Sequence, residues 1–202
     1  MEIVALAPIL VVLVLGAMSP GPSLAVLLRN TMEGGKAQGV SCGIGHGIGF
    51  GIYAFVAIVG ISQLKASATE IALFLESAGG LFLLFLAAMM FKGSDDEIEH
   101  KYPSRRGFSE GFLIAFLNPK ILVFLIAIFS QFIQPDFTWS ERLIIAGIAL
   151  LIDGGWYVLV ALIISETPIL SILKEHARGF EITMAAVLAG LGIWILLGIK
   201  TV

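Results

Sequence analysis

Charged residues are scarce in this chain of 202 residues. Only 13% are Asp, Glu, Lys or Arg, whereas 58% are hydrophobic, and the mean hydropathy is +0.99. Soluble domains carry about 25% charged residues, so the polar surface is too small to cover a globule of this size. The formal net charge of −3 argues against a nucleic-acid partner. The composition predicts an all-α integral membrane protein whose main partner is the lipid bilayer.

Cysteine and the common enzyme motifs are also nearly absent. Cys42 is the only cysteine, which excludes an internal disulfide, a CxxC redox pair and a thiolate metal cluster. GxSxG, HExxH and phosphate-loop motifs are missing, and the three histidines (His46, His100 and His176) are scattered. We therefore expect neither an enzyme nor a bound cofactor nor a metal site.

Long apolar runs occupy most of the chain. A transmembrane helix needs roughly 20 mostly apolar residues. Six segments qualify, at about 3–28, 37–63, 70–91, 108–134, 141–165 and 180–199. The fourth contains Lys120 and the fifth contains Asp153, so five spans is the main alternative. The polar stretch at 92–107 is predicted to be a solvated connection.

The positive charges in the connections predict the orientation. With six spans, eight Lys and Arg residues fall on one side and three on the other. The larger group is Arg29, Lys36, Lys92, Lys101, Arg105, Arg106, Lys174 and Arg178, and the smaller is Lys65, Arg142 and Lys200. Because the side richer in Lys and Arg stays in the cytoplasm, we expect a multi-pass protein of the inner (plasma) membrane with both termini outside.

An internal repeat is predicted from three pairs of landmarks. Ser19-Pro20 matches Asn118-Pro119 at an offset of 99 residues, GIYAFVAI (51–58) matches GWYVLVAL (155–162) at 104, and Glu76 matches Glu181 at 105. An odd number of spans in each half inverts the second half relative to the first. The predicted architecture is two inverted three-helix repeats, residues 1–97 and 98–202, in one compact membrane domain.

The two proline motifs predict helix breaks in the first and fourth spans. Ser and Asn favour the N-cap of a helix and Pro its first position, so each motif can start a half-helix within the membrane. Two such starts present free N–H groups and positive dipole ends, which suit a carboxylate. The predicted breaks lie at Pro20–Pro22 and at Pro119, and a simple kink without a ligand is the alternative.

Three polar residues inside the predicted spans are further candidates. Lys120 could attract a substrate carboxylate, pair with Asp153 or extend to an interface. Asp153 could bind a substrate ammonium or exchange a coupling proton. His46 could relay protons, although a single histidine on a packed helix is more often a hydrogen-bonded structural group.

Glycines recur every four residues in the second predicted span. Gly39, Gly43, Gly47 and Gly51 form one stripe, with Gly45 and Gly49 on a neighbouring face. Such stripes allow close helix packing, which is the favoured interpretation. Exposure of the backbone to a substrate, and pairing of two copies into a homodimer, are the alternatives.

These motifs together resemble one family. The resemblance rests on Ser19-Pro20-Gly21-Pro22, the glycine-rich second span, GGLFLLFLAAMMFKG (79–93), Phe116-Leu117-Asn118-Pro119-Lys120 and LAGLGIWILLG (188–198). They are similar to the lysine exporter / homoserine-threonine resistance (LysE/RhtB) family over essentially the whole chain. The resemblance implies an inner-membrane amino-acid exporter that is driven by proton exchange and needs no cofactor. The third span departs from the family pattern, which leaves the substrate open.

The sequence therefore predicts a proton-coupled antiporter that exports small amino acids or related metabolites by alternating access. The predicted substrate-binding residues are Ser19, Pro20, Gly21, Pro22, Asn118, Pro119, Lys120 and Asp153, and the predicted proton-coupling residues are Asp153 and His46. An ion or heavy-metal exporter of the same superfamily is the main alternative, and a non-transporting membrane scaffold is another.

Overall fold

The computed structural model describes residues 3–19, 21–67, 69–92, 107–164 and 169–198, and every regular element in these ranges is a helix. The helices are α1 (Ile3–Met18), α2 (Pro22–Ser67), α3 (Thr69–Lys92), α4 (Gly107–Phe116), α5 (Pro119–Phe132), α6 (Trp139–Ile164) and α7 (Ile169–Gly198). The all-α prediction is confirmed. Pro20, the repeat boundary at 97/98 and most of the predicted polar connection lie outside the described residues, as does the side chain of Glu181.

Helix length and hydropathy support part of the predicted set of spans. Within the described ranges, α2 and α6 are long and apolar enough to cross a membrane, and α4 with α5 adds a third if this bent pair is one span. Three apolar stretches are shorter, at Pro8–Met18, Glu76–Met89 and Ala185–Gly198. The count of six spans stays a prediction.

Two helices extend beyond the predicted spans. The helical segment that begins at Pro22 continues past residue 28 to a turn at Gly35. The last helix begins at Ile169, ahead of the predicted span at 180–199. Both extensions contain charged residues that form helices readily in water, so hydropathy alone underestimates their length.

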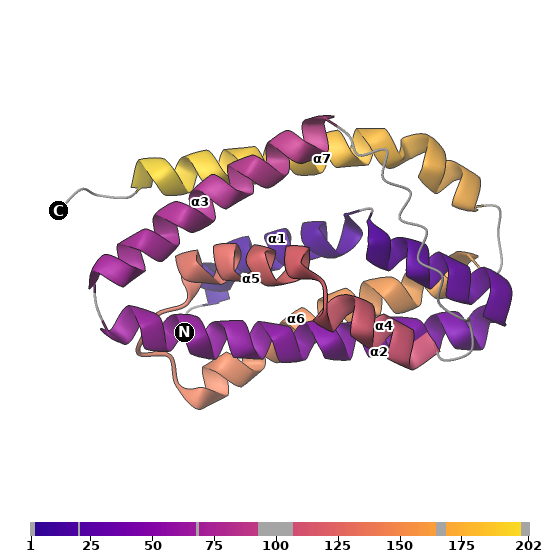
Figure 1. Cartoon of the computed structure of the whole chain (residues 1–202), viewed down its shortest axis with the longest axis horizontal. Helices are drawn as coiled ribbons and strands as arrows, with labels where there is room; N and C mark the ends of the chain where they lie inside the picture. Colours follow the sequence, from indigo (N-terminus) through magenta and orange to yellow (C-terminus); the bar gives the residue numbers. More distant parts are fainter. Residues whose placement is uncertain (1–2, 20, 68, 93–106, 165–168, 199–202) are drawn as a thin grey trace.

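Gly35 makes the sharp reversal inside α2. Its backbone has φ 77° and ψ 176°, in a region that side-chain-bearing residues rarely adopt. The helical segment 22–34 before it and the longer segment 36–67 after it therefore run in opposite directions, as Figure 1 shows at one end of the molecule. The reversal makes this end the meeting place of the first two predicted spans.

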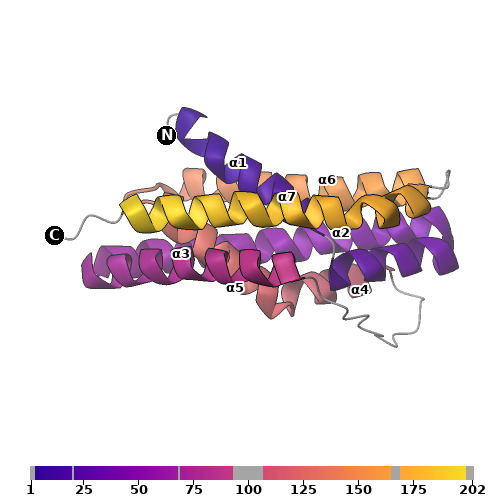
Figure 2. The ribbon, with the colours of Figure 1, turned by 90° about the horizontal axis from the view of Figure 1, so that it is seen from above.

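The helices form three tiers (Figure 1). α3 and α7 pack together on one side, α1 and α5 lie in the middle, and α2, α4 and α6 form the opposite side. Seen from above, α7 lies along α3, and the N-terminal part of α1 leans away from the bundle (Figure 2). α5 contacts α1, α2 and α3, so the second half-helix lies at the centre of the fold.

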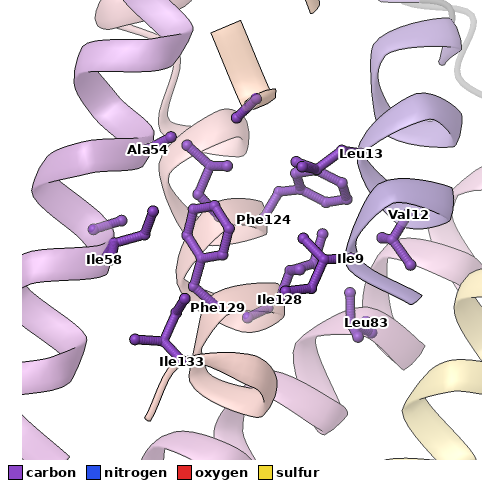
Figure 3. Close-up of a cluster of buried hydrophobic side chains, with 14 of the residues drawn as sticks. Ile9, Val12, Leu13, Ala54, Ile58, Leu83, Phe124, Ile128, Phe129 and Ile133 are labelled. Carbon is purple, nitrogen blue, oxygen red and sulfur yellow. The ribbon is translucent and has the colours of Figure 1, made fainter. Parts of the chain in front are cut away.

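The apolar core surrounds α5. Figure 3 shows Phe124, Ile128 and Phe129 of α5 between Ile9 and Leu13 of α1 and other apolar side chains. Large apolar side chains also cover the outside, where Leu197 is 82% exposed and Phe74 71%. An apolar exterior suits lipid, and packing between helices then depends on van der Waals fit.

Glycines let the longer segment of α2 approach both α4 and α6. A Cβ on Gly47 would lie 2.5 Å from Gly154 Cα, and one on Gly43 would lie 2.8 Å from Val158 N. On the neighbouring face, a Cβ on Gly49 would lie 2.8 Å from Phe112 O of α4. The stripe therefore serves close packing within one chain, as favoured from the sequence. It is not the surface through which two copies could pair.

We predict that Gly47→Ala destabilises the protein by about 1–3 kcal/mol, because the new methyl group meets backbone that cannot move independently of α6. Thermal unfolding in detergent measures the change. Gly60→Ala on the same helix is the matched control, because its Cβ would meet nothing within 4 Å. Equal melting temperatures for the two variants would contradict this account of the α2–α6 contact.

Candidate binding site between the broken helices

The first break separates α1 from α2. The Ser19 N–H donates to Gly16 O at 3.1 Å as α1 ends, and the Ala25 N–H donates to Gly21 O at 3.2 Å as α2 begins. Gly21 therefore occupies the N-cap and Pro22 the first helical position. The break was predicted, but Ser19 as its N-cap was wrong. Pro22 needs no N–H partner at the start of a helix, so the second proline sets the start.

The second break separates α4 from α5. Asn118 is the N-cap of α5, its side-chain Oδ1 accepts a hydrogen bond from the Lys120 N–H at 3.0 Å, and Pro119 follows at the first turn. The axes of α4 and α5 differ by 55°. The predicted start of a half-helix at Asn118-Pro119 is therefore confirmed.

A cavity of about 70 Å³ lies where the two breaks meet. It is lined by Gly16, Ser19, Gly21, Pro22, Ser23, His46, Phe50, Asn118, Lys120, Ile121, Phe124, Asp153, Tyr157 and Leu188. Candidate residues from four separate predicted spans thus line one cavity. Of the predicted site residues, Pro20 and the side chain of Pro119 lie outside the described residues.

His46 and Asp153 form a buried pair beside this cavity. The His46 Nδ1 lies 2.6 Å from Asp153 Oδ2, and the two side chains are 2% and 3% exposed. The Tyr157 ring stacks on the His46 ring with centroids 4.0 Å apart and planes 14° apart. Asp153 was predicted to face Lys120 as one alternative, and the structure gives it His46 as a partner. Lys120 is exposed and also lines the cavity.

Two buried polar atoms of cavity-lining residues have no hydrogen-bond partner among the described residues. They are Ser19 Oγ and His46 Nε2. An unsatisfied buried polar atom costs about 1–3 kcal/mol, so such atoms usually meet water or a ligand. Their position at the cavity gives it unused hydrogen-bonding capacity at its polar side.

The cavity has a polar side and an apolar side. The two helix starts, Lys120 and the His46–Asp153 pair are polar, whereas Phe50, Phe124, Ile121 and Leu188 are apolar. The helix starts and Lys120 carry positive charge or partial charge, and Asp153 carries the negative charge. The cavity can therefore offer opposite charges to the two ends of a small zwitterion.

Tyr157 and Ser23 are the polar lining residues that the sequence did not single out. Tyr157 lies four positions after Asp153, one helical turn along the same face, so helical spacing could have identified it. Ser23 directly follows Pro22 in the first turn of α2 and has no sequence signal of its own. The link between His46 and Asp153 crosses 107 residues and has no local signature.

Broken helices around a central cavity, in an all-helical chain with membrane-span candidates, define a helical membrane translocator. Residues 14–198 match the family model described as LysE type translocator, and the chain belongs to this family. It is thus a membrane protein of a transporter family, as the resemblance implied.

The chain is similar to several known proteins. It is 27% identical to the uncharacterized membrane protein YahN of Escherichia coli over 65% of this chain and 62% of YahN. It is 26% identical to the uncharacterized membrane protein YrhP of Bacillus subtilis, covering 86% of this chain and 90% of that protein. It is 20% identical to the threonine efflux protein of Escherichia coli over 91% and 93% of the two chains. No solved structure matches this chain.

We predict that His46 and Asp153 are energetically coupled. Removing one partner leaves a buried polar group unpaired, so His46→Ala and Asp153→Ala should each cost about 2–4 kcal/mol. The double variant should cost less than the sum by at least about 1 kcal/mol. A double-mutant cycle of unfolding in detergent measures this coupling, with exposed Asp136→Ala as control. Additive costs would show that the pair does not form.

Proposed function

We propose that this protein exports small amino acids across the inner membrane by alternating access, in exchange for protons. The observation that supports the proposal is the cavity shared by the two helix starts and the His46–Asp153 pair. It offers opposite charges to the two ends of an amino acid. The similarity to threonine efflux proteins supports export as the activity and a short side chain in the substrate.

The substrate carboxylate would lie at the two helix starts. The first turns of α2 and α5 hold N–H groups that have no partner within their own helices, and both ends carry partial positive charge. Gly21 and Pro22 form one start, with Ser19 beside it at the end of α1, and Asn118 and Pro119 form the other, where Lys120 adds a full positive charge. An anion bound here would be held mainly by backbone, so its recognition needs no particular side chain on the substrate.

The substrate ammonium would lie at the His46–Asp153 pair, with the side chain against the apolar wall. Phe50 and Phe124, on α2 and α5, are 4% and 8% exposed and leave little room around the small cavity. A side chain of the size of serine, threonine or homoserine fits this space better than that of lysine or tryptophan. The Ser19 hydroxyl can bond a polar atom of such a substrate.

The same pair would carry the coupling proton. With His46 neutral, its Nδ1–H donates to Asp153 and the pair keeps one negative charge that attracts the ammonium. When the pair takes up a proton its net charge becomes zero, and that attraction is lost. Proton uptake from outside then favours release of the substrate there, and proton loss to the cytoplasm restores the binding state.

Two inverted three-helix repeats, residues 1–97 and 98–202, would provide the alternating motion. The described helices support this because the breaks occur in the first and fourth predicted spans, and because α2 packs on α6 and α3 on α7. α1 begins and α7 ends at the same end of the bundle (Figure 1), as expected if both termini face the same side. The excess of Lys and Arg in the opposite connections supports an outside location for that side.

Asp153→Asn tests the role of the pair. The amide keeps the size of the side chain but removes the negative charge and the exchangeable proton, so we expect counterflow in proteoliposomes to fall about tenfold or more and to lose its pH dependence. Asp136→Asn, in the exposed connection before α6, is the matched control. An unchanged rate with full pH dependence would reject the assignment.

A thermal-shift screen tests the substrate class. Threonine, serine or homoserine at about 100 times Kd should stabilise the purified protein by about 2.7 kcal/mol, since they bind only the folded state. The screen includes the other amino acids and divalent cations. Stabilisation by divalent cations alone would instead favour the ion-exporter alternative, and equal stabilisation by large and small amino acids would contradict the proposed fit.

A further inference from the structure

One ion network joins the first half-helix to α4, away from the cavity. The Arg29 guanidinium pairs with the Glu110 carboxylate, and Asn30 Nδ2 donates to the same Glu110 oxygen at 2.8 Å. Asn30 is fully buried, and its amide also donates to Val26 O at 2.9 Å within its own helix. The Glu110 side chain is 11% exposed. This network connects the predicted first repeat with the predicted second repeat.

A second ion network joins α2, α3 and α5. Lys65 Nζ lies 2.7 Å from Glu76 Oε1 and donates to Ser130 O at 2.7 Å, in the last turn of α5. The Lys65 side chain is 5% exposed and that of Glu76 28%. Gln131 Nε2 also donates to Glu76 O at 3.0 Å. A positive charge at the C-terminal end of a helix is favourable, so Lys65 ties both α3 and α5 to the end of α2.

The two networks lie at opposite ends of the bundle with the cavity between them. Arg29 is close to the reversal at Gly35. Lys65 lies thirty residues after Gly35 in α2, which is roughly 45 Å of helix. Figure 1 shows that reversal at one end and the start of α3 at the other. Each network includes a half-helix that begins at the cavity, because Arg29 and Asn30 belong to the segment 22–34 and Ser130 belongs to α5. None of their side chains lines the cavity.

Stability alone does not account for these buried ions. A buried ion pair is often no more stabilising than apolar residues of the same volume, because both charges lose water. An ion pair is, however, a contact that can be exchanged for water when two elements separate. Partial exposure of Glu76 and Arg29, at 28% and 20%, makes this exchange possible at both ends.

We propose that these two networks are the access gates of the cavity, a proposal that rests on alternating access as the mode of transport. Arg29, Asn30 and Glu110 form the gate on the side of the Gly35 reversal, which the charge distribution assigns to the cytoplasm. Lys65 and Glu76, with the end of α5, form the gate on the outer side. Breaking one network while the other holds opens the cavity to one side at a time.

Accessibility of the cavity from each side tests the gates without any substrate. In a Cys42→Ala background, Ser23→Cys places the only thiol at the cavity. A membrane-impermeant maleimide is then applied to spheroplasts and to inside-out vesicles. Glu110→Gln should raise the labelling rate about tenfold from the Gly35 side only, and Glu76→Gln should do so from the Lys65 side only, because each removes about one ion pair from the closed state.

Each gate variant has a matched control on the same or a neighbouring helix. For the Glu110 variant the control is Glu33→Gln, near Arg29 on α2. For the Glu76 variant it is Glu70→Gln, in the first turn of α3. Both glutamates are exposed. The charge-swapped pair Arg29→Glu with Glu110→Arg should return labelling toward the parent rate. If Glu110→Gln does not fold, Arg29→Gln is used instead, because it removes the same ion pair by neutralising the positive partner.

The outcomes separate the gates from the transported substrate. Labelling that rises from both sides, or that is unchanged in both gate variants, overturns the gate proposal whatever the protein transports. Labelling that follows the gates while no amino acid is exchanged leaves the gates standing and rejects the substrate assignment.

Discussion

The close contact between α2 and α6 is the constraint on which the rest of the site depends. Gly47 and Gly154 let the two backbones approach so closely that a single added methyl group would meet the opposite chain. His46 lies one position before Gly47 and Asp153 one before Gly154, so the contact that needs the glycines also brings the histidine to the carboxylate. A wider helix separation would leave both polar groups buried without each other, which is costly in an apolar surrounding.

Around this contact, the backbone supplies hydrogen-bond donors at the starts of α2 and α5. Two helices start at the cavity because proline suits the first turn of a helix, where some N–H groups have no partner within the helix itself. Backbone groups bind an anion without a strong dependence on the rest of the ligand. In the proposed site the apolar wall would limit the size of the substrate, and the His46–Asp153 pair would supply the group whose charge changes. These are separate tasks performed by separate elements, which suits a translocator that must bind and release the same molecule.

Among the described residues, buried ion pairs lie at the centre of the bundle and toward each of its ends, and they differ in their partners. The central pair is almost fully enclosed, whereas the networks at Glu110 and at Lys65 are partly exposed and connect different helices. Enclosure favours a group that exchanges a proton with a ligand, and partial exposure favours a contact that water can replace. The central pair and the end networks are therefore suited to different steps of one transport cycle.

The amino-acid sequence by itself determined the membrane environment, the helical class and the positions of both breaks, because hydropathy, proline and N-cap preferences act over a few residues. Local signals also identified His46, Lys120 and Asp153 one by one, since polar groups are rare in such apolar runs. Only the tertiary structure decided that Gly21 instead of Ser19 caps α2, that His46 pairs with Asp153, and that Arg29 meets Glu110 and Lys65 meets Glu76. These contacts, apart from the cap, join residues distant along the chain. They depend on how closely whole helices approach one another, which no local pattern of residues specifies.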